Sequence, residues 1–149
     1  MRARRATAAD WPEVAALRTR VFVEEQGVPA EVEQDEHDAT AVHALAEDED
    51  GRVVATGRLL VRDGRAVIGR MAVDAGARGR GHGAAVLAEL HRQAVRLGLR
   101  EVELHAQVTA RRFYERAGYT AVGGEYEEAG IRHVTMRRPL LDVRAEPPH

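Results

Sequence analysis

The predicted order of secondary-structure elements places this sequence of 149 residues in the α/β class, as a single domain of mixed α+β character. Two helical patterns come first, three strand-like runs follow, and a helix, a strand, a short helix and a final pair of strands complete the chain. This order excludes a helical bundle and an all-β sandwich. Because the length fits one core rather than two, we expect one domain at residues 1–142 and a C-terminal tail at 143–149.

A first helix is predicted at about Trp11–Glu24, because Asp10–Glu13 combines a cap residue, an early proline and a glutamate. Gly27 and Pro29 break this helix. The stretch Glu24–Asp38 carries seven acidic residues and is predicted to be a short second helix or an exposed loop. These acids could attract a cationic amine, such as a polyamine, an aminoglycoside or a lysine side chain, but a solvated helix face is the favoured interpretation.

Three strand-like runs follow, at about Ala39–Glu47, Arg52–Val61 and Arg65–Val73. The dipeptides Asp50-Gly51 and Asp63-Gly64 separate them, and both are typical of hairpin turns. The three runs therefore predict an antiparallel meander.

A glycine-rich segment leads into the best-supported helix of the sequence, in which apolar residues recur at helical spacing. The residues on that face are Val86, Leu87, Leu90, Ala94 and Leu97, and Gly98 ends the helix. Alternating polarity then predicts a strand at Glu101–Gln107, and a short helix follows at about Ala110–Ala117. Strands near Tyr119–Tyr126 and Ile131–Arg138 are expected to form a closing hairpin, and Pro139 ends the fold.

Composition limits the chemistry that this domain can perform. The net charge is −2, from 22 basic and 24 acidic side chains, so no global positive field favours a nucleic-acid partner. No segment approaches the roughly 20 apolar residues of a membrane span, and there is no cysteine for disulfides or thiolate chemistry. We therefore expect a cytoplasmic protein without a membrane partner. Because the histidines are scattered without the spacing of a metal motif, we expect no metal.

The segment Arg78–Ala84 lies between a predicted strand and a predicted helix and has the composition of a phosphate-binding turn, which we call the cradle. Glycines let successive N–H groups converge on one anion, and neighbouring cationic side chains add charge. The glycines are Gly79, Gly81 and Gly83, and the cationic candidates are Arg78, Arg80 and His82. The spacing fits neither a Walker loop nor a dinucleotide fingerprint. The cradle therefore predicts a pyrophosphate ligand, and a tight turn that binds nothing is the alternative.

Two spaced motifs resemble the GNAT superfamily of N-acyltransferases. Arg78-x-x-Gly81-x-Gly83 is similar to its acetyl-CoA signature, and Ala110–Tyr119 follows its A-x-x-x-Y-x-x-x-G-[FY] pattern. Three further segments resemble the ElaA/YjcF-like branch, and the resemblance covers about Arg4–Leu140. These segments are Arg20–Gln26, Leu104–Gln107 and Glu128–His133.

The resemblance implies a mostly antiparallel seven-stranded sheet with helices on both faces. Strands four and five would splay apart, and the thioester-bearing arm of acetyl-CoA would enter the gap. Backbone groups of Met71, Ala72 and Val73 would pair with the pantetheine amides, and Gln107 would stand where many members have a cofactor-binding asparagine. The implied activity is acetyl-CoA-dependent transfer of an acetyl group to a primary amine of a small molecule or peptide by direct attack. A non-catalytic acyl-CoA-binding sensor or interaction module is the alternative.

Acyl transfer also needs a proton donor for the departing thiolate, and Tyr114 is the candidate, because a phenol with a pKa of about 10 can donate to it. The matching tyrosine of the superfamily usually has this role beside the cofactor, whereas a packed core tyrosine is the alternative. His105 leads as general base, because imidazole titrates near neutral pH. Glu25 is the second candidate; it would act through water and contact the acceptor.

The acceptor side is defined less well. His43 and His133 lie on predicted strands and could line the same cavity, although a single strand histidine is more often structural. The predicted fourth strand lacks the acidic base that many superfamily members carry there. Arg70 on that strand could bind an acceptor carboxylate, balance the acidic segment Glu24–Asp38, or remain a solvated surface charge. The expected partners are acetyl-CoA, an amine acceptor and, in a homodimer, a second copy of the chain.

Overall fold

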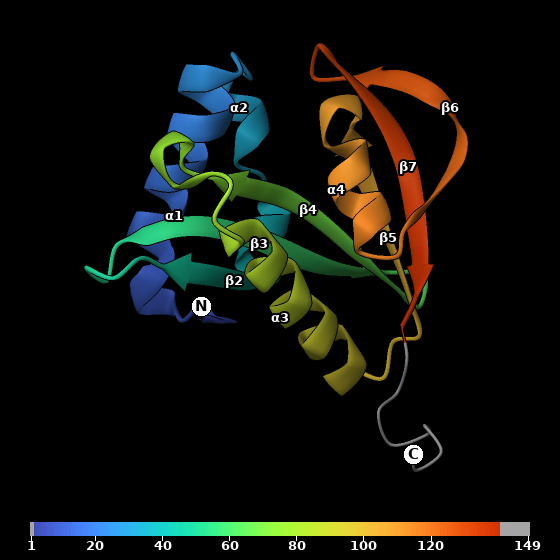
Figure 1. Cartoon of the computed structure of the whole chain (residues 1–149), viewed down its shortest axis with the longest axis horizontal. Helices are drawn as coiled ribbons and strands as arrows, with labels where there is room; N and C mark the ends of the chain where they lie inside the picture. Colours follow the sequence, from blue (N-terminus) through green and yellow to red (C-terminus); the bar gives the residue numbers. More distant parts are fainter. Residues whose placement is uncertain (1, 141–149) are drawn as a thin grey trace.

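The computed structural model describes residues 2–140, which form one sheet of seven strands with helices on both faces (Figure 1). The strands are β1 (Ala3–Arg5), β2 (Val42–Glu47), β3 (Val53–Arg62), β4 (Arg65–Val73), β5 (Glu101–Gln107), β6 (Thr120–Glu128) and β7 (Ile131–Pro139). The helices are α1 (Trp11–Arg18), α2 (Ala30–Glu33), α3 (His82–Arg96) and α4 (Arg111–Arg116). This arrangement confirms the predicted α/β class.

The strands lie in the order β1-β2-β3-β4-β5-β7-β6, and all neighbours pair antiparallel except β4 and β5, which run parallel. The predicted meander and the closing hairpin are both present. The residue pattern does not predict β1, because three residues are too few to show alternation. The predicted tail at 143–149 lies outside the described residues, as do the first residue and the last two residues of the predicted domain.

Left-handed backbone explains two of the hairpin turns. Asp63 and Gly64 join β3 to β4 with φ of 52° and 73°, and Ala129 and Gly130 join β6 to β7 with φ of 52° and 78°. Two successive residues with positive φ make the tight turn whose twist matches paired antiparallel strands. Glycine adopts this conformation without a steric penalty, so the Asp-Gly dipeptide turns the chain where the sequence predicts it.

The predicted helix at Trp11–Glu24 is present but changes geometry along its length. α1 ends at Arg18, and a π-helical segment, Thr19–Glu25, continues it. π-helical turns are frequent at functional sites. Here the segment ends with Glu25 beside the turn that follows β4, where its carboxylate accepts two hydrogen bonds from Arg78.

Helices α3 and α4 pack on one face of the sheet, and α1 packs on the other. The first core includes Leu59, Ile68, Leu90, Leu104 and Met136, and the second includes Val14, Leu17, Leu45 and Ala72. Gly57 on β3 lets α3 approach the sheet closely, because an added Cβ would lie 2.9 Å from Leu90 and 3.2 Å from Val86. The close fit fixes the position of α3, whose first turn begins the candidate site.

Strands β4 and β5 pair over only three residue positions, ending where Ile68 faces Leu104. Beyond that point β4 continues to Val73 and β5 continues to Gln107, but the two strands no longer pair with each other. They therefore splay apart. Figure 1 shows the result: β2, β3 and β4 with α1 and α2 form one half of the molecule, and β5, β6 and β7 with α4 form the other. The splay expected from the resemblance is therefore present.

Candidate active site

The turn between β4 and α3 has the predicted strand–glycine turn–helix geometry. Gly79 and Gly81 adopt left-handed conformations, with φ of 79° and 86°, and Gly81 directly precedes the first turn of α3. A Cβ added at Gly83 would lie 3.3 Å from the side chain of Val73 and would narrow the approach to the helix. The free N–H groups at the start of α3 therefore face an accessible turn, which fits a ligand that carries a pyrophosphate.

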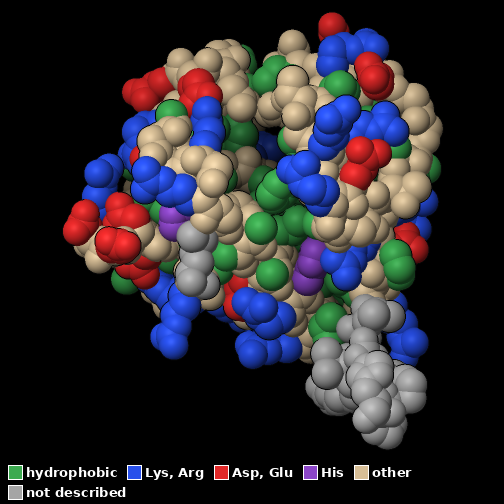
Figure 2. Space-filling model, viewed as in Figure 1, with side chains coloured by type: hydrophobic (Ala, Val, Ile, Leu, Met, Phe, Trp, Pro, Cys, Tyr) green, Lys and Arg blue, Asp and Glu red, His purple; other side chains and the backbone are tan. Residues whose placement is uncertain are grey.

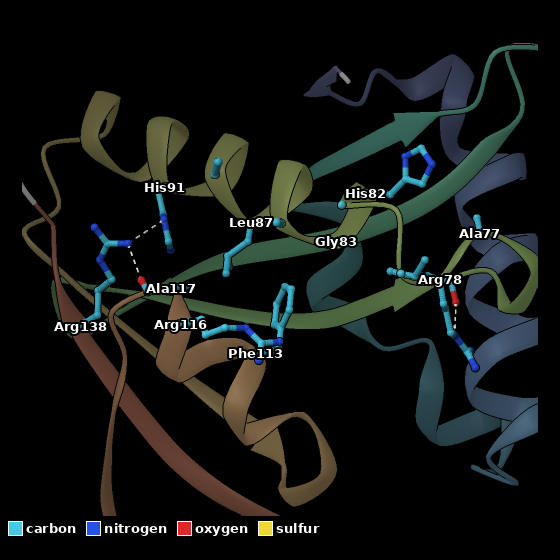
Figure 3. Close-up of a pocket in the computed structure, with 15 residues that line it drawn as sticks. Ala77, Arg78, His82, Gly83, Leu87, His91, Phe113, Arg116, Ala117 and Arg138 are labelled. Atoms are coloured by element: carbon cyan, nitrogen blue, oxygen red, sulfur yellow. Dashed lines mark hydrogen bonds between the residues drawn. The ribbon is translucent and has the colours of Figure 1, made fainter.

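A groove of about 560 Å³ extends from the cradle between α3 and α4, and we call it the α3–α4 groove (Figure 3). Its middle is apolar, with Leu87 and Phe113 on its two walls. Its end away from the cradle is formed by His91, Arg116 and Arg138. The groove is therefore long enough to hold more than a pyrophosphate.

The charged side chains of the cradle differ in what they contact. Arg78 donates two hydrogen bonds of 2.7 Å to the Glu25 carboxylate and one of 3.1 Å to the Val73 carbonyl. Hydrogen bonding from Arg78 lowers the pKa of Glu25, which remains ionised at neutral pH. Arg80 is exposed, and His82 is buried with its imidazole directed away from Phe113 and α4 (Figure 3). His82 therefore faces the groove with its backbone.

A second cavity, of about 780 Å³, lies on the face of the sheet covered by α1 and α2, at the gap between β4 and β5. We call it the β4–β5 cavity. Val73 and Arg78 line both this cavity and the α3–α4 groove, so the two spaces meet at the end of β4. Figure 2 shows a hollow between the two halves of the molecule, with hydrophobic side chains on its floor and arginines on the side of α4.

The splayed part of β4 carries Met71, Ala72 and Val73, which line the β4–β5 cavity. Ala72 and Val73 pair with β3 on one side and have no β5 partner on the other. The Val73 carbonyl accepts a hydrogen bond from Arg78, but no strand pairs with this edge of β4, so a ligand that enters the gap would lie beside an open strand edge.

Tyr114 lies on α4 at the same gap and lines the β4–β5 cavity with only 7% of its surface exposed. The rings of Phe113 and Tyr119 pack against it, with centroid distances of 5.0 Å and 5.7 Å. Burial raises the pKa of the Tyr114 phenol, so it stays protonated at neutral pH. The residue is thus both packed and in contact with the cavity.

The predicted histidines His105 and His133 come together around one carboxylate. Glu128 Oε1 lies 3.4 Å from His105 Nδ1, and Glu128 Oε2 lies 3.8 Å from His133 Nε2. A second carboxylate, that of Glu103, lies 3.5 Å from His105 Nε2. The Tyr126 ring meets both imidazoles, edge-on at 5.9 Å for His105 and stacked at 6.1 Å for His133. These contacts fix the orientation of both imidazoles, and both histidines line the β4–β5 cavity.

Gln107 and Glu25 lie at opposite edges of the gap. The Gln107 amide donates a hydrogen bond of 2.8 Å to the Gln26 side chain, which joins β5 to the π-helical segment. Gln107 lines the β4–β5 cavity together with Glu25 and Gln26. The sequence-predicted Glu25 is therefore near the other candidates, but its carboxylate is already paired with Arg78.

Part of the acidic segment Glu24–Asp38 is buried against arginines. Arg18 and Glu33 are 1% and 2% exposed and form an ion pair. Asp38 accepts hydrogen bonds of 2.8 Å from both Arg18 and Arg58, and Arg58 also binds Asp35 at 2.7 Å. Burial opposes ionisation of Asp38, but hydrogen bonds from Arg18 and Arg58 outweigh it and lower its pKa to about 2. The interpretation of a solvated helix face is wrong for these residues.

Arg70 lies where the pairing of β3 with β4 shifts register, and its φ is 53°. It donates hydrogen bonds to the carbonyls of Glu33 and Val32, at 3.0 Å and 3.3 Å, and to Asp35 at 3.3 Å. Of the three predicted interpretations, balancing the acidic segment fits these contacts. Arg70 also lines the β4–β5 cavity.

Two predicted site residues line neither the groove nor the cavity: the exposed Arg80 and, on a different part of the fold, His43. Its Nε2 atom is 3.0 Å from the Asp38 carbonyl oxygen, and its ring lies 5.2 Å from that of Trp11. Burial lowers its pKa, so it is neutral at pH 7. These contacts give His43 a place in the packing between β2 and α1.

Sequence reasoning did not single out Glu128, Tyr126 or Gln26 as site residues. Tyr126 and Glu128 are two residues apart on β6, so their side chains share one face of the strand. That spacing, together with the strand pairing of Tyr126 opposite His133, places both beside the predicted histidines. The residue pattern predicts that these two strands pair but does not predict their register. The position of Tyr126 and Glu128 beside the histidines follows only from that register.

Comparisons with known proteins agree with this geometry. The chain matches the acetyltransferase (GNAT) domain family over residues 7–140. It is 34% identical over 123 residues to YjcF of Bacillus subtilis (strain 168), named an uncharacterized N-acetyltransferase, covering 82% of this chain and 87% of that protein. An acyl-CoA N-acyltransferase from Pseudomonas aeruginosa is similar in structure, with a TM-score of 0.78, 33% identity and coverage of 91% and 97%. Escherichia coli ElaA gives a TM-score of 0.80 at 27% identity, with coverage of 93% and 99%.

The fold is that of the N-acyltransferases, a class of enzymes that use an acyl-CoA as acyl donor. The chain belongs to the acetyltransferase (GNAT) domain family, and this membership supports N-acetyltransferase activity. No helix within residues 2–140 is long and apolar enough to cross a membrane. No group of three or more His, Cys, Asp or Glu side chains in that range could hold a metal ion.

Proposed function

We propose that this protein transfers an acetyl group from acetyl-CoA to a primary amine of a small molecule or peptide by direct attack. One observation carries the proposal: the α3–α4 groove and the β4–β5 cavity lie on opposite faces of the sheet and meet at Val73 and Arg78. A ligand bound by the cradle can therefore reach through the sheet toward an acceptor on the other face.

The cofactor would be held mainly by backbone groups. The cradle Arg78–Ala84 offers free N–H groups at the start of α3 to the pyrophosphate. The unpaired edge of β4 at Met71, Ala72 and Val73 offers backbone groups to the pantetheine amides. Acetyl-CoA supplies the thioester when bound, and the sheet gap would orient it between Tyr114 and the acceptor side.

Tyr114 would act as general acid. Its phenol lines the cavity and stays protonated at neutral pH because burial raises its pKa. A protonated phenol at the gap can donate to the departing thiolate. Packing against Phe113 and Tyr119 limits the positions that its ring can take.

His105 would act as general base. Its imidazole lies between Glu103 and Glu128, and both carboxylates would stabilise the imidazolium that forms when it takes a proton from the amine. Glu25 is the weaker candidate, because hydrogen bonding from Arg78 lowers its pKa and so reduces its affinity for a proton. His133 would contact the acceptor from the same wall.

The test is a set of single substitutions assayed for free thiol release from acetyl-CoA with a panel of amines. Tyr114→Phe and His105→Ala should each lower kcat by about 100-fold or more, because each removes a proton-transfer group. The Kd for acetyl-CoA should change by less than about threefold. His43→Ala is the matched control, since this histidine lies outside both spaces, and it should keep kcat.

Two results would contradict the proposal in different ways. Tight acetyl-CoA binding without turnover on any amine would leave an acyl-CoA sensor as the better description. Absence of acetyl-CoA binding would contradict the cofactor itself. The cytoplasmic location, the lack of a nucleic-acid or membrane partner and the homodimer stay predictions.

A further inference from the structure

One arginine of the β4–β5 cavity pairs with no carboxylate of residues 2–140. This is Arg62, at the end of β3, whose guanidinium contacts only the imidazole of His37, at 3.1 Å from Nη2 to Nε2. The other arginines that line the cavity each form an ion pair with a carboxylate, and they are Arg58, Arg70 and Arg78. Arg62 is therefore the cation of this cavity that is available to an anionic group of a ligand.

The opposite wall of the cavity carries a carboxylate without an arginine partner. The oxygens of Glu128 lie 3.4 Å from His105 and 3.8 Å from His133, and no arginine in the described part of the chain pairs with them. The other carboxylates that line the cavity all pair with arginines, and they are Glu25, Glu33 and Asp35. The negative charge of Glu128 would attract a cationic amine to the side of His105, the proposed base.

Apolar side chains line the cavity between these two charges. Leu60 and Arg62 lie at alternate positions of β3 and so share one face of the strand. Val67 of β4 is the pairing partner of Leu60, and both residues line the cavity. Leu104 of β5 lines it as well. A ligand that reaches from one charge to the other would therefore pass over an apolar floor, which suits a chain of methylene groups.

The register of three strands sets the distance between the two ends of the floor. Leu60 pairs with Val67, and Val67 pairs with Glu103 of β5. Arg62 lies two residues after Leu60, and His105 lies two residues after its strand neighbour, in the opposite direction because β3 is antiparallel to β5. With about 3.3 Å per residue and 4.8 Å per strand, the two Cα atoms are about 16 Å apart. Both side chains line the cavity, so the ligand has a shorter span of several bonds to bridge.

We infer that the acceptor is an elongated amino-carboxylate, with its amine beside Glu128 and His105 and its carboxylate on Arg62. The inference rests on the proposed function and names the chemical class of its acceptor. A planar guanidinium suits this contact, because it donates two parallel hydrogen bonds to a carboxylate. In the transfer the amine nitrogen bonds the acetyl carbon, the carbon–sulfur bond breaks, His105 takes the amine proton and Tyr114 protonates the thiolate. Arg62 therefore determines specificity without taking part in proton transfer.

The experiment compares 6-aminohexanoate with 6-aminohexanamide as acceptors, by free thiol release from acetyl-CoA. The two probes have the same length and the same amine, and only the first carries a negative charge at its other end. The wild-type protein should give a kcat/KM at least about tenfold higher for the carboxylate, mainly through a lower KM, as expected for charge-assisted hydrogen bonds. Glycine should lack this advantage over glycinamide, because it is too short to reach Arg62 from His105.

Two variants of Arg62 and one control test the contact. Arg62→Gln should bring the ratio of the two kcat/KM values close to one. Arg62→Glu should reverse the preference, so that 1,6-diaminohexane becomes a better acceptor than 6-aminohexanoate, which loss of a merely structural arginine would not produce. Arg52→Gln is the matched control, because Arg52 is an exposed arginine just before β3 that does not line the cavity, and it should keep the wild-type ratio.

Equal kcat/KM values for the carboxylate and the amide in the wild-type protein would overturn the inference while leaving acetyl transfer intact. An equal loss on both probes in Arg62→Gln would also overturn it, because it would assign Arg62 to the shape of the cavity. Absence of thiol release with every amine would instead contradict the proposed function. In that case calorimetric titration of the two probes into protein saturated with coenzyme A decides the carboxylate preference by itself, and equal Kd values would overturn it.

Discussion

The α3–α4 groove and the β4–β5 cavity are built in different ways. The cradle end of the groove is one continuous segment whose glycines expose the backbone at the start of α3. The cavity is built from side chains of α2, β3, β4, β5, α4 and the β6–β7 hairpin, and it contains both carboxylates and arginines. Backbone geometry therefore shapes the proposed cofactor side, whereas charge pairs between distant segments shape the proposed acceptor side.

The largest effect is expected where the acceptor side depends on buried charge. Arg18→Met should lower the free energy of unfolding by about 3 kcal/mol or more, because Glu33 and Asp38 would lose a buried partner. Urea denaturation followed by circular dichroism measures it. Arg20→Met is the control, since its ion pair with Asp74 is exposed and should contribute less than about 1 kcal/mol. Equal losses in the two variants would show that the buried network does not hold this wall.

A smaller effect is expected where the cofactor side depends on backbone conformation. Gly81→Ala should weaken acetyl-CoA binding by about tenfold, because the left-handed φ of 86° costs a residue with a Cβ about 1–2 kcal/mol and the turn would relax. Calorimetry gives the Kd. Gly76→Ala, in the same loop, is the control: an added Cβ there meets nothing within 4 Å and φ is not in the left-handed range. A Kd unchanged by Gly81→Ala would show that acetyl-CoA binding does not depend on the left-handed backbone of Gly81.

The smallest effect concerns acid stability at the far end of the groove. Burial and the nearby Arg138 and Arg92 lower the pKa of His91 to about 4, against about 6.5 in an unfolded chain. Between these values the unfolded state binds more protons, so stability is full above about pH 6.5 and falls as the pH drops toward 4.

With partial solvent exposure taken into account, this His91 contribution should be about 1 kcal/mol. His91→Gln should therefore flatten the loss of unfolding free energy between pH 6.5 and pH 4, measured by urea titration at several pH values. The same slope in wild-type protein and variant would show that His91 does not titrate in this window. His37→Gln, which removes an exposed imidazole, controls for the loss of a histidine in general.

The sequence predicts the geometry of the cradle and of α4 well because its information is local. The cradle glycines, the helix that follows them and Tyr114 lie in short segments whose spacing is readable without the fold. The α/β class and the strand order of the meander follow from alternation and turn dipeptides in the same way. β1 is not predicted, because its three residues are too few to show alternation. Its position is fixed by its pairing with β2.

The acceptor side is less predictable because its contacts are distant in sequence. Glu33 and Asp38 look like solvated charges until the fold brings Arg18 and Arg58 against them. Glu128 comes between His105 and His133 only through the pairing of β5, β7 and β6. His43 shows the reverse, since its strand is predicted well but its side chain faces Trp11 rather than the cavity.

The arginines of the β4–β5 cavity have a consequence for an enzyme that acylates amines. Every one of the 22 basic residues in the sequence is an arginine, and Arg58, Arg70 and Arg78 line the cavity. A guanidinium stays protonated at any physiological pH, so it is a poor nucleophile, unlike the lysine amine that loses its proton readily when buried. In the proposed reaction the cavity would therefore hold a reactive thioester without offering it a side-chain amine, and the acceptor would have no internal competitor for the acetyl group.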